Sequence, residues 1–254
     1  MKLVGIAGTK RSGKGSSVKY IYGQILQKND VIDKFEIDED GNLLVPGAFE
    51  DGIRMARFDI ERRDIEFATY AQECMWPYVK DYYFASFLKE QIHRMFDISY
   101  EQLNGTTEEK ESDTPYTWGQ SFPKVTAKYL KEIGATKDSF IKAREFVQNY
   151  ADLIRQIDNE AFIRVTMEEI SVDQTPVSII GDVRTVSELR AIKNAGGKVI
   201  YLNRRDHSDP HKVESELVSL DPSEFDAVID NSNMTIAEKN VEIHRICDSW
   251  GIFE

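Results

Sequence analysis

The stretch Gly8-Thr9-Lys10-Arg11-Ser12-Gly13-Lys14-Gly15-Ser16 constrains the fold of this chain more than any other part of its sequence. It follows a short apolar run, residues 3–7, which is rich in β-formers and predicts a buried parallel strand. Apolar residues at helical spacing come next and predict a helix; they are Val18, Ile21, Tyr22, Ile25 and Leu26. Strand, glycine-rich turn and helix, in that order, form the context of a phosphate-binding loop.

The spacing within this stretch predicts how a phosphate chain is held. In Gly8-x4-Gly13-Lys14 the turn directs successive backbone N–H groups at phosphate oxygens, and the lysine reaches the outer phosphates. The helix that begins near Gly15 adds its positive N-terminal end. A glycine-rich turn that only supports tight packing is the alternative interpretation. The residues predicted to bind the nucleotide are Gly8, Lys10, Arg11, Ser12, Gly13, Lys14, Gly15, Ser16 and Ser17.

One position departs from the strict loop pattern, which has Ser or Thr directly after the lysine. Gly15 stands there, and Ser16 follows it. The order Gly-Lys-Gly-Ser resembles the Gly-Lys-Gly-Thr of adenylate-kinase-like enzymes, in which the hydroxyl one place later serves the metal and the phosphates. The resemblance implies that Ser16 is the metal ligand of the loop, with Ser17 in reserve.

A second polar group follows an apolar run at residues 179–181 and consists of Asp182, Arg184 and, one turn further on, Glu188. Ligands of open parallel sheets bind beyond the carboxyl ends of the strands, so we expect Asp182 and Arg184 to face the same crevice as the loop. Asp182 could hold magnesium, and Arg184 could clamp a transferring or accepting phosphate. A helix N-terminal aspartate and a surface arginine are the alternative.

Cations in the middle of the chain form a third group, Lys124, Lys128 and Lys131, of which the last two share a helix face. Phosphoryl-transfer enzymes surround the transferring group with positive charge, often on a mobile segment that closes over the nucleotide. Lysines at helical spacing also form ordinary solvated faces, and that alternative stays open.

Arg204 follows a predicted strand end and could touch the base or the phosphates of a nucleotide, although a charged strand exit explains it equally well. The pair His207-x3-His211 does not predict a metal site. Pro210 interrupts any helix there, and no third ligand is evident.

The remaining patterns predict an α/β fold. Strands are expected at residues 177–180, 198–202 and 227–229, with a helix at 186–194 completing a βαβ unit and an amphipathic helix over 236–246. Asp40-Gly41-Asn42 predicts a β-hairpin within residues 33–52. Residues 81–96 predict a helix, residues 97–111 a polar loop, and residues 124–133 and 138–158 further helices.

The expected fold class is therefore α/β, a doubly wound parallel sheet that carries a phosphate-binding loop and a largely helical insertion. One domain is expected over residues 1–254, in which residues 33–160 form an insertion made of the hairpin and a helical region.

Composition limits the partners. The 254 residues carry 32 Lys and Arg against 44 Asp and Glu, and a net charge of −12 disfavours a nucleic-acid polymer but permits a small phosphorylated ligand in a locally basic cleft. The two cysteines show no disulfide or zinc spacing. No signal segment or membrane span is recognised, which predicts an intracellular, cytoplasmic protein without a membrane partner.

Five stretches together resemble the deoxynucleoside monophosphate kinases of tailed bacteriophages, distant relatives of adenylate kinase. They are Met1-Lys2-Leu3-Val4 running into residues 8–14, Phe84-Ala85-Ser86-Phe87-Leu88-Lys89, residues 126–134, Asp182-Val183-Arg184 with Glu188, and residues 211–216. The resemblance covers most of the chain, and its first stretch is the most specific. It implies a doubly wound parallel sheet of the P-loop kinase type, in which the insertion at residues 33–160 forms the hairpin and the helical acceptor-binding and lid region.

The resemblance implies an ATP- and magnesium-dependent kinase that converts deoxynucleoside monophosphates to diphosphates in the host cytoplasm, and it suggests a homodimer. Lys14 and Ser16 would bind ATP and its metal, with Asp182 also a metal ligand. Lys128 and Lys131 would occupy lid positions where family members often have arginine, and Gly15 stands where phage members often carry aspartate. Lys89 would lie near the acceptor monophosphate, with Arg184 and Glu188 as further acceptor-binding residues.

Two other functions are compatible with the residues themselves. The same loop serves kinases of other small phosphorylated metabolites, because a fold does not choose its acceptor. A non-catalytic ATP-binding switch would also need the loop, but it would bind ATP without turnover that depends on an acceptor.

Overall fold

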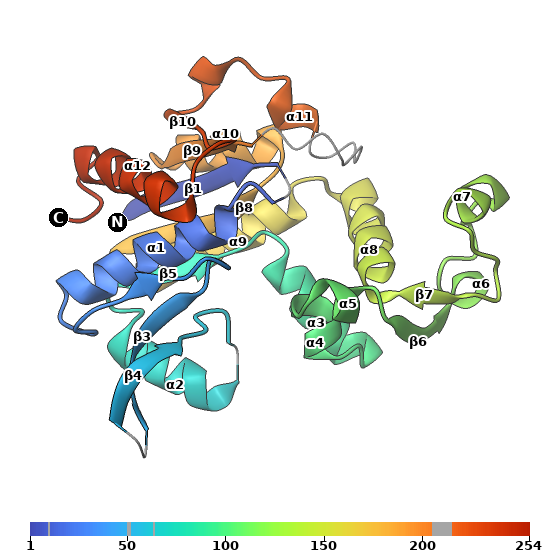
Figure 1. Ribbon diagram of the computed structural model, residues 1–254. Helices are drawn as coiled ribbons and strands as arrows, with labels where there is room; N and C mark the ends of the chain where they lie inside the picture. The colour runs from blue at the N-terminus through green and yellow to red at the C-terminus, as the bar shows by residue number, and fades with distance from the viewer. Residues whose placement is uncertain (10, 50–51, 63, 205–214) are drawn as a thin grey trace. The chain divides into compact units, whose positions relative to one another are not determined.

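The computed structural model describes residues 1–9, 11–49, 52–62, 64–204 and 215–254 (Figure 1). It contains two compact units, of which the first joins Met1–Tyr83 to Thr166–Glu254 and the second is Phe84–Val165. The description of the whole chain as one domain with residues 33–160 inserted stays a prediction.

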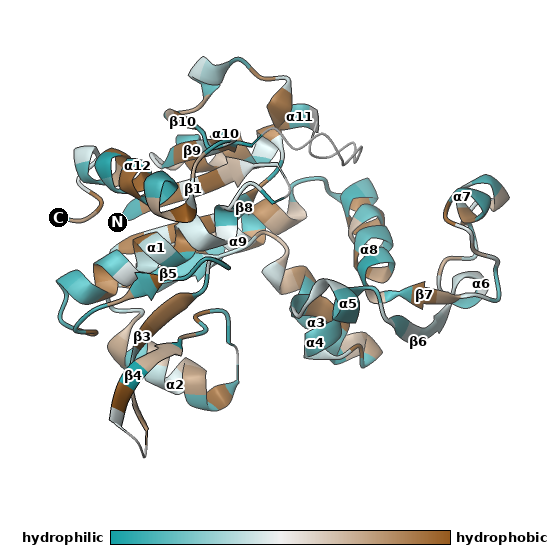
Figure 2. Ribbon diagram, viewed as in Figure 1, coloured by the Kyte–Doolittle hydropathy of each residue, from teal (hydrophilic) through white to brown (hydrophobic). Residues whose placement is uncertain are grey.

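The first unit is built on a five-stranded parallel sheet in the order β10-β9-β1-β8-β5. Its central strand is β1 (Lys2–Gly8), which lies between β8 (Val177–Val183) and β9 (Lys198–Asn203). The edges are β5 (Val79–Tyr82) and β10 (Ala227–Asp230). The central strands are strongly apolar (Figure 2), as expected of parallel strands covered on both faces.

Two helices, α1 (Lys14–Lys28) and α12 (Ile236–Ser249), pack together on one face of this sheet. Val4 and Ile6 point to that face, and both are fully buried in the same apolar core as Ile21 of α1. Side chains alternate along a strand, so position 5, between Val4 and Ile6, faces the other side of the sheet.

The opposite face is covered by α10 (Val186–Asn194) and α9 (Ala161–Asp173). A Cβ atom at Gly5 would lie 2.8 Å from the side chain of Ile192, and the hydroxyl of Tyr82 donates a hydrogen bond to α9 at 2.9 Å. Helices therefore cover both faces, which confirms the predicted α/β, doubly wound parallel sheet of the P-loop kinase type.

A second, three-stranded antiparallel sheet belongs to the first unit and consists of β2 (Glu36–Ile37), β3 (Leu43–Phe49) and β4 (Gly52–Arg57). Asp38 closes the turn between β2 and β3, because its Oδ1 accepts from the backbone N–H of Asn42 at 2.7 Å. The predicted hairpin is confirmed. The helices α2 (Ile65–Cys74) and α11 (Ser215–Val218) and a 3₁₀ turn (Pro222–Glu224) complete the described part of this unit.

The second unit is mostly helical around an aromatic core. Phe96, Tyr116 and Phe146 meet there, with the rings of Phe96 and Phe146 5.1 Å apart. Its elements are α3 (Ser86–Phe96), α4 (Tyr100–Asn104), α5 (Thr107–Lys110), β6 (Asp113–Thr117), α6 (Trp118–Ser121), α7 (Ala127–Glu132), β7 (Phe140–Lys142) and α8 (Ala143–Ile157).

Three boundary predictions were wrong. The helix expected from residue 81 begins only at Ser86, because residues 79–82 pair with β8 as a sheet strand. The polar segment 97–111 contains two short helices rather than a loop, each begun by a capping box. The helix expected from residue 138 begins at Ala143, because residues 140–142 form β7 against β6.

Within the described ranges, no helix combines the length and the apolar character that crossing a membrane requires.

Candidate active site at the phosphate-binding loop

The loop between β1 and α1 is held open by glycines. Gly8 ends β1 at φ 145°, where a Cβ atom would lie 2.6 Å from both the Leu202 carbonyl oxygen and the Ser12 hydroxyl. Gly13 precedes α1 in the left-handed region at φ 89°, and no side chain of the described residues caps the first turn. An anion can therefore take the place of a capping side chain at the positive end of α1.

Lys14 lies across this loop. Its Nζ donates to the carbonyl oxygens of Gly8 at 2.7 Å and Thr9 at 2.8 Å, and lies 3.7 Å from Oδ1 of Asp182. The side chain thus connects the loop to the end of the neighbouring strand β8, as the parallel pairing of β1 with β8 requires.

Asp182 and Arg184 form an ion pair at the carboxyl end of β8. The Nε and Nη2 atoms of Arg184 lie 2.7 and 2.6 Å from Oδ2 of Asp182. The other carboxylate oxygen, Oδ1, is buried and accepts no hydrogen bond from the described residues. The structure therefore brings together the loop lysine, one carboxylate and one guanidinium, as the sequence predicted.

Glu188 has backbone partners. Its carboxylate accepts from the N–H groups of Arg184 at 2.7 Å and Thr185 at 3.0 Å, and Thr185 caps α10 in return. Only 7% of Glu188 is exposed, and burial raises the pKa of its carboxyl above the ordinary value of 4.5. In this geometry Glu188 fixes the backbone that carries Arg184.

The hydroxyls of Ser16 and Ser17 both approach the Gly13 carbonyl oxygen, at 3.0 and 2.9 Å. The turn of the β2–β3 hairpin packs against the same place, since a Cβ atom on Gly41 would lie 2.8 Å from Cβ of Ser16. The β2–β3 hairpin therefore packs directly beside the phosphate-binding loop.

Two side chains that the sequence patterns did not single out also contact the loop. Lys239 of α12 donates to Oγ of Ser16 at 2.6 Å and to the Gly13 carbonyl oxygen at 3.1 Å. Burial, with a smaller effect of the nearby Arg204 charge, lowers the pKa of Lys239 to about 8. Asn231, which follows β10, donates to the Ser12 carbonyl oxygen at 2.7 Å.

Arg204 lies beside the loop as well. Its Nη1 donates to the carbonyl oxygen of Arg11 at 3.3 Å, and its own carbonyl oxygen lies 3.4 Å from the Thr9 hydroxyl. Arg11 adopts φ 60°, which is uncommon for a residue other than glycine. Lys10, His207 and His211 lie outside the described residues.

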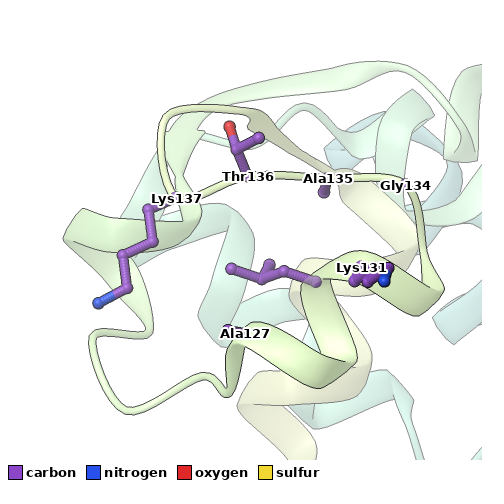
Figure 3. Close-up of a pocket in the computed structure, with 7 residues that line it drawn as sticks. Ala127, Lys131, Gly134, Ala135, Thr136 and Lys137 are labelled. Carbon is purple, nitrogen blue, oxygen red and sulfur yellow. The ribbon is translucent and has the colours of Figure 1, made fainter.

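The predicted acceptor and lid cations belong to the second unit. Lys89 of α3 donates to Oδ1 of Asn104 at 3.1 Å. Lys128 of α7 is 87% exposed and lies 3.9 Å from Glu132 one turn later. Lys131 lines an open pocket of about 530 Å³ between α7 and the following loop, with Lys137 at its opposite end (Figure 3).

A parallel sheet whose first strand runs through a glycine-rich loop into α1, with Lys14 facing Asp182 on the neighbouring strand, defines the P-loop class of phosphate-binding folds. The sequence matches the family described as deoxynucleotide monophosphate kinase over residues 2–240. The chain belongs to that family, and it is a nucleoside monophosphate kinase-type phosphotransferase that phosphorylates deoxynucleoside monophosphates. This confirms the resemblance, apart from a phage origin, which stays an expectation. No curated protein matches the chain significantly.

Proposed function

We propose that this kinase takes ATP as its phosphoryl donor and binds it, with magnesium, at residues 8–17. The observation that carries the proposal is the approach of Lys14 to Asp182, 3.7 Å across the end of β1 and β8, with Arg184 paired to the same carboxylate. These groups form a charged cluster where the ligands of a parallel sheet bind.

The residues present fit a magnesium ion. Among the described residues, no group of three or more His, Cys, Asp or Glu side chains could hold a metal ion by itself. Magnesium in phosphoryl-transfer sites usually takes one or two protein oxygens and otherwise phosphates and water. Within the described ranges Oδ1 of Asp182 is buried and accepts no hydrogen bond, and the Ser16 hydroxyl lies at the start of α1. When bound, the ion would neutralise charge on the phosphates.

The reaction needs alignment and charge rather than a strong base, because a phosphate oxygen of the acceptor is already a good nucleophile. The acceptor oxygen forms a bond to the γ-phosphorus of ATP while the bond between that phosphorus and the β–γ bridging oxygen breaks. The bridging oxygen leaves as part of ADP. Lys14 balances charge on the outer phosphates of ATP. Arg184 stabilises the phosphoryl group in transfer, and Asp182 orients Arg184.

Other residues take supporting roles in this proposal. The backbone of Gly8, Ser12, Gly13 and Gly15 surrounds the phosphates, and Arg11, Ser17 and Arg204 border them. Glu188 acts through the backbone of Arg184. Lys89 as an acceptor-binding residue, Lys128 and Lys131 as lid cations, and a homodimer stay predictions, and so does Lys10 as a nucleotide contact.

Nucleotide binding tests the donor and the metal. We expect the purified chain to bind ATP more tightly with magnesium than with EDTA. Lys14→Met should lower the affinity for ATP tenfold or more under both conditions. Lys28→Met removes an exposed lysine from the end of the same helix and should leave both affinities unchanged. Asp182→Asn should reduce the difference that magnesium makes. An affinity for ATP that is equal with magnesium and with EDTA would contradict the proposed metal site.

A further inference from the structure

Lys239 lies in a place that is unusual for a lysine. It belongs to the first turn of α12, only 2% of it is exposed, and its Nζ lies against the start of α1. Lysines are almost never fully buried unless a carboxylate pairs with them. In the described part of the chain the partners of this nitrogen are a carbonyl oxygen and a hydroxyl, neither of which carries a negative charge.

A buried cation without a counter-charge destabilises the folded protein until an anion arrives. The anion-binding end of α1 is adjacent, because Nζ contacts Gly13 and Ser16, the residues on either side of the helix start. Room for the ammonium depends on glycine, since a Cβ atom on Gly13 would lie 3.1 Å from Nζ.

The hydrogen bonds of Lys239 leave capacity for a ligand. An ammonium has three N–H donors, and the Gly13 carbonyl and the Ser16 hydroxyl take two of them. The Ser16 hydroxyl in turn donates to the Gly13 carbonyl at 3.0 Å. One donor and the positive charge therefore remain for a ligand beside the start of α1.

We propose that Lys239 is a second phosphate-binding lysine, which supplies its charge and its third N–H to a phosphate of the nucleotide held by the loop. Lys14 belongs to the loop itself, whereas Lys239 reaches Gly13 and Ser16 from α12. The inference rests on the proposed binding of ATP at residues 8–17. It assigns to α12 a direct part in nucleotide affinity.

The test uses the full chain and the variant Lys239→Met, which keeps the length of the side chain and removes its charge. Arg245→Met is the matched control, because Arg245 is an exposed cation on the same helix, paired with Glu242 at 3.0 Å. Affinities for ATP and for inorganic tripolyphosphate, which has no base or sugar, are measured in EDTA so that no metal contributes.

We expect Lys239→Met to lower the affinities for ATP and for tripolyphosphate by a similar factor, tenfold or more. It should also make the affinity for ATP less sensitive to salt. Without ligand its Tm should be no lower than that of the parent, because an unpaired buried charge has gone. Arg245→Met should change none of these values.

Unchanged tripolyphosphate affinity in Lys239→Met would overturn the proposal, and so would a lowered Tm together with an unchanged salt dependence, which would show a structural role. If the parent chain itself does not bind ATP, the proposed function fails. If the parent binds ATP and Lys239→Met binds it equally well, only the role of Lys239 fails.

Discussion

Glu188 offers a sharp test, because sequence and structure assign it different partners. As an acceptor-binding residue it would need its charge. As the cap of α10 it needs only an oxygen that accepts from the N–H groups of Arg184 and Thr185, at 2.7 and 3.0 Å. Glutamine supplies such an oxygen and also completes a capping box, whereas alanine supplies neither.

The geometry sets the expected magnitudes. Glu188→Ala leaves two backbone donors without their protein partner, at about 1 kcal/mol for each when water replaces part of the bond. A total of about 2 kcal/mol corresponds to a fall in Tm of about 4–8 °C for a chain of this size. Glu188→Gln should cost less than about 1 kcal/mol, because its amide oxygen keeps the bonds and no buried charge remains.

Thermal unfolding and steady-state kinetics on both variants decide between the roles. Glu188→Gln should keep the parent Tm to within about 3 °C and the parent KM for the deoxynucleoside monophosphate to within about threefold. A tenfold rise in that KM with an unchanged Tm would refute the capping argument. Equal losses of Tm in the glutamine and alanine variants would refute it too.

The pH dependence of stability gives an independent check on Glu188. Burial raises the pKa of its carboxyl above 4.5, so the folded protein holds this proton more tightly than the unfolded chain does. The stability that this bound proton gives to the folded protein is complete below pH 4.5, and it is lost as pH rises through the raised pKa of Glu188. Measured against the parent at each pH, the Tm of Glu188→Gln should therefore rise over this window, and a difference that falls would contradict the sign.

Three further variants test the rest of the site. Asp182→Asn should lower kcat/KM about a hundredfold or more, because it loosens the guanidinium that the carboxylate holds at 2.6–2.7 Å; a loss under threefold would exclude that role. Gly181→Ala should destabilise the fold by about 1–3 kcal/mol in denaturant unfolding, because its methyl would lie 2.4 Å from the Tyr83 ring, and an unchanged midpoint would contradict this. The double variant Lys128→Met with Lys131→Met should lower kcat and leave ATP affinity intact; unchanged turnover would remove both from the lid.

The parts of the fold with strong local patterns were predictable from the sequence. β1, the loop, β8, α10 and β9 lie where apolar runs and glycine spacing place them, since these strands are buried on both faces and read as continuous apolar segments. The approach of Lys14 to Asp182 follows from parallel pairing of their strands. Such features depend on neighbours in sequence and on one general rule of sheet topology.

β5 was not predictable in the same way. Lys80 and Asp81 interrupt its apolar pattern. Lys80 is accommodated because two carboxylates of α9, Glu169 at 3.1 Å and Asp173 at 2.5 Å, lie 89 and 93 residues later in the sequence. The short helices at residues 100–110 did carry a readable signal, since Ser99 with Gln102 and Thr106 with Glu109 form capping boxes.

Lys239 was hidden for a related reason. In sequence it is an ordinary lysine near the start of an amphipathic helix, where solvent exposure is the normal expectation. Its burial comes from the packing of α12 on α1, and its partners Gly13 and Ser16 are 226 and 223 residues away. Asn231 was not predictable for the same reason, because its contact with Ser12 joins residues 219 positions apart in the sequence.

The central claim is that the loop lysine and the Asp182–Arg184 pair transfer the γ-phosphoryl of ATP to a deoxynucleoside monophosphate. The most direct measurement is chromatographic quantification of products from purified protein, Mg-ATP and each common deoxynucleoside monophosphate. The account predicts equal amounts of ADP and deoxynucleoside diphosphate, formed only when acceptor is present and lost in Lys14→Met but not in Lys28→Met. ADP formed at the same rate without acceptor, or no diphosphate with any acceptor, would contradict it.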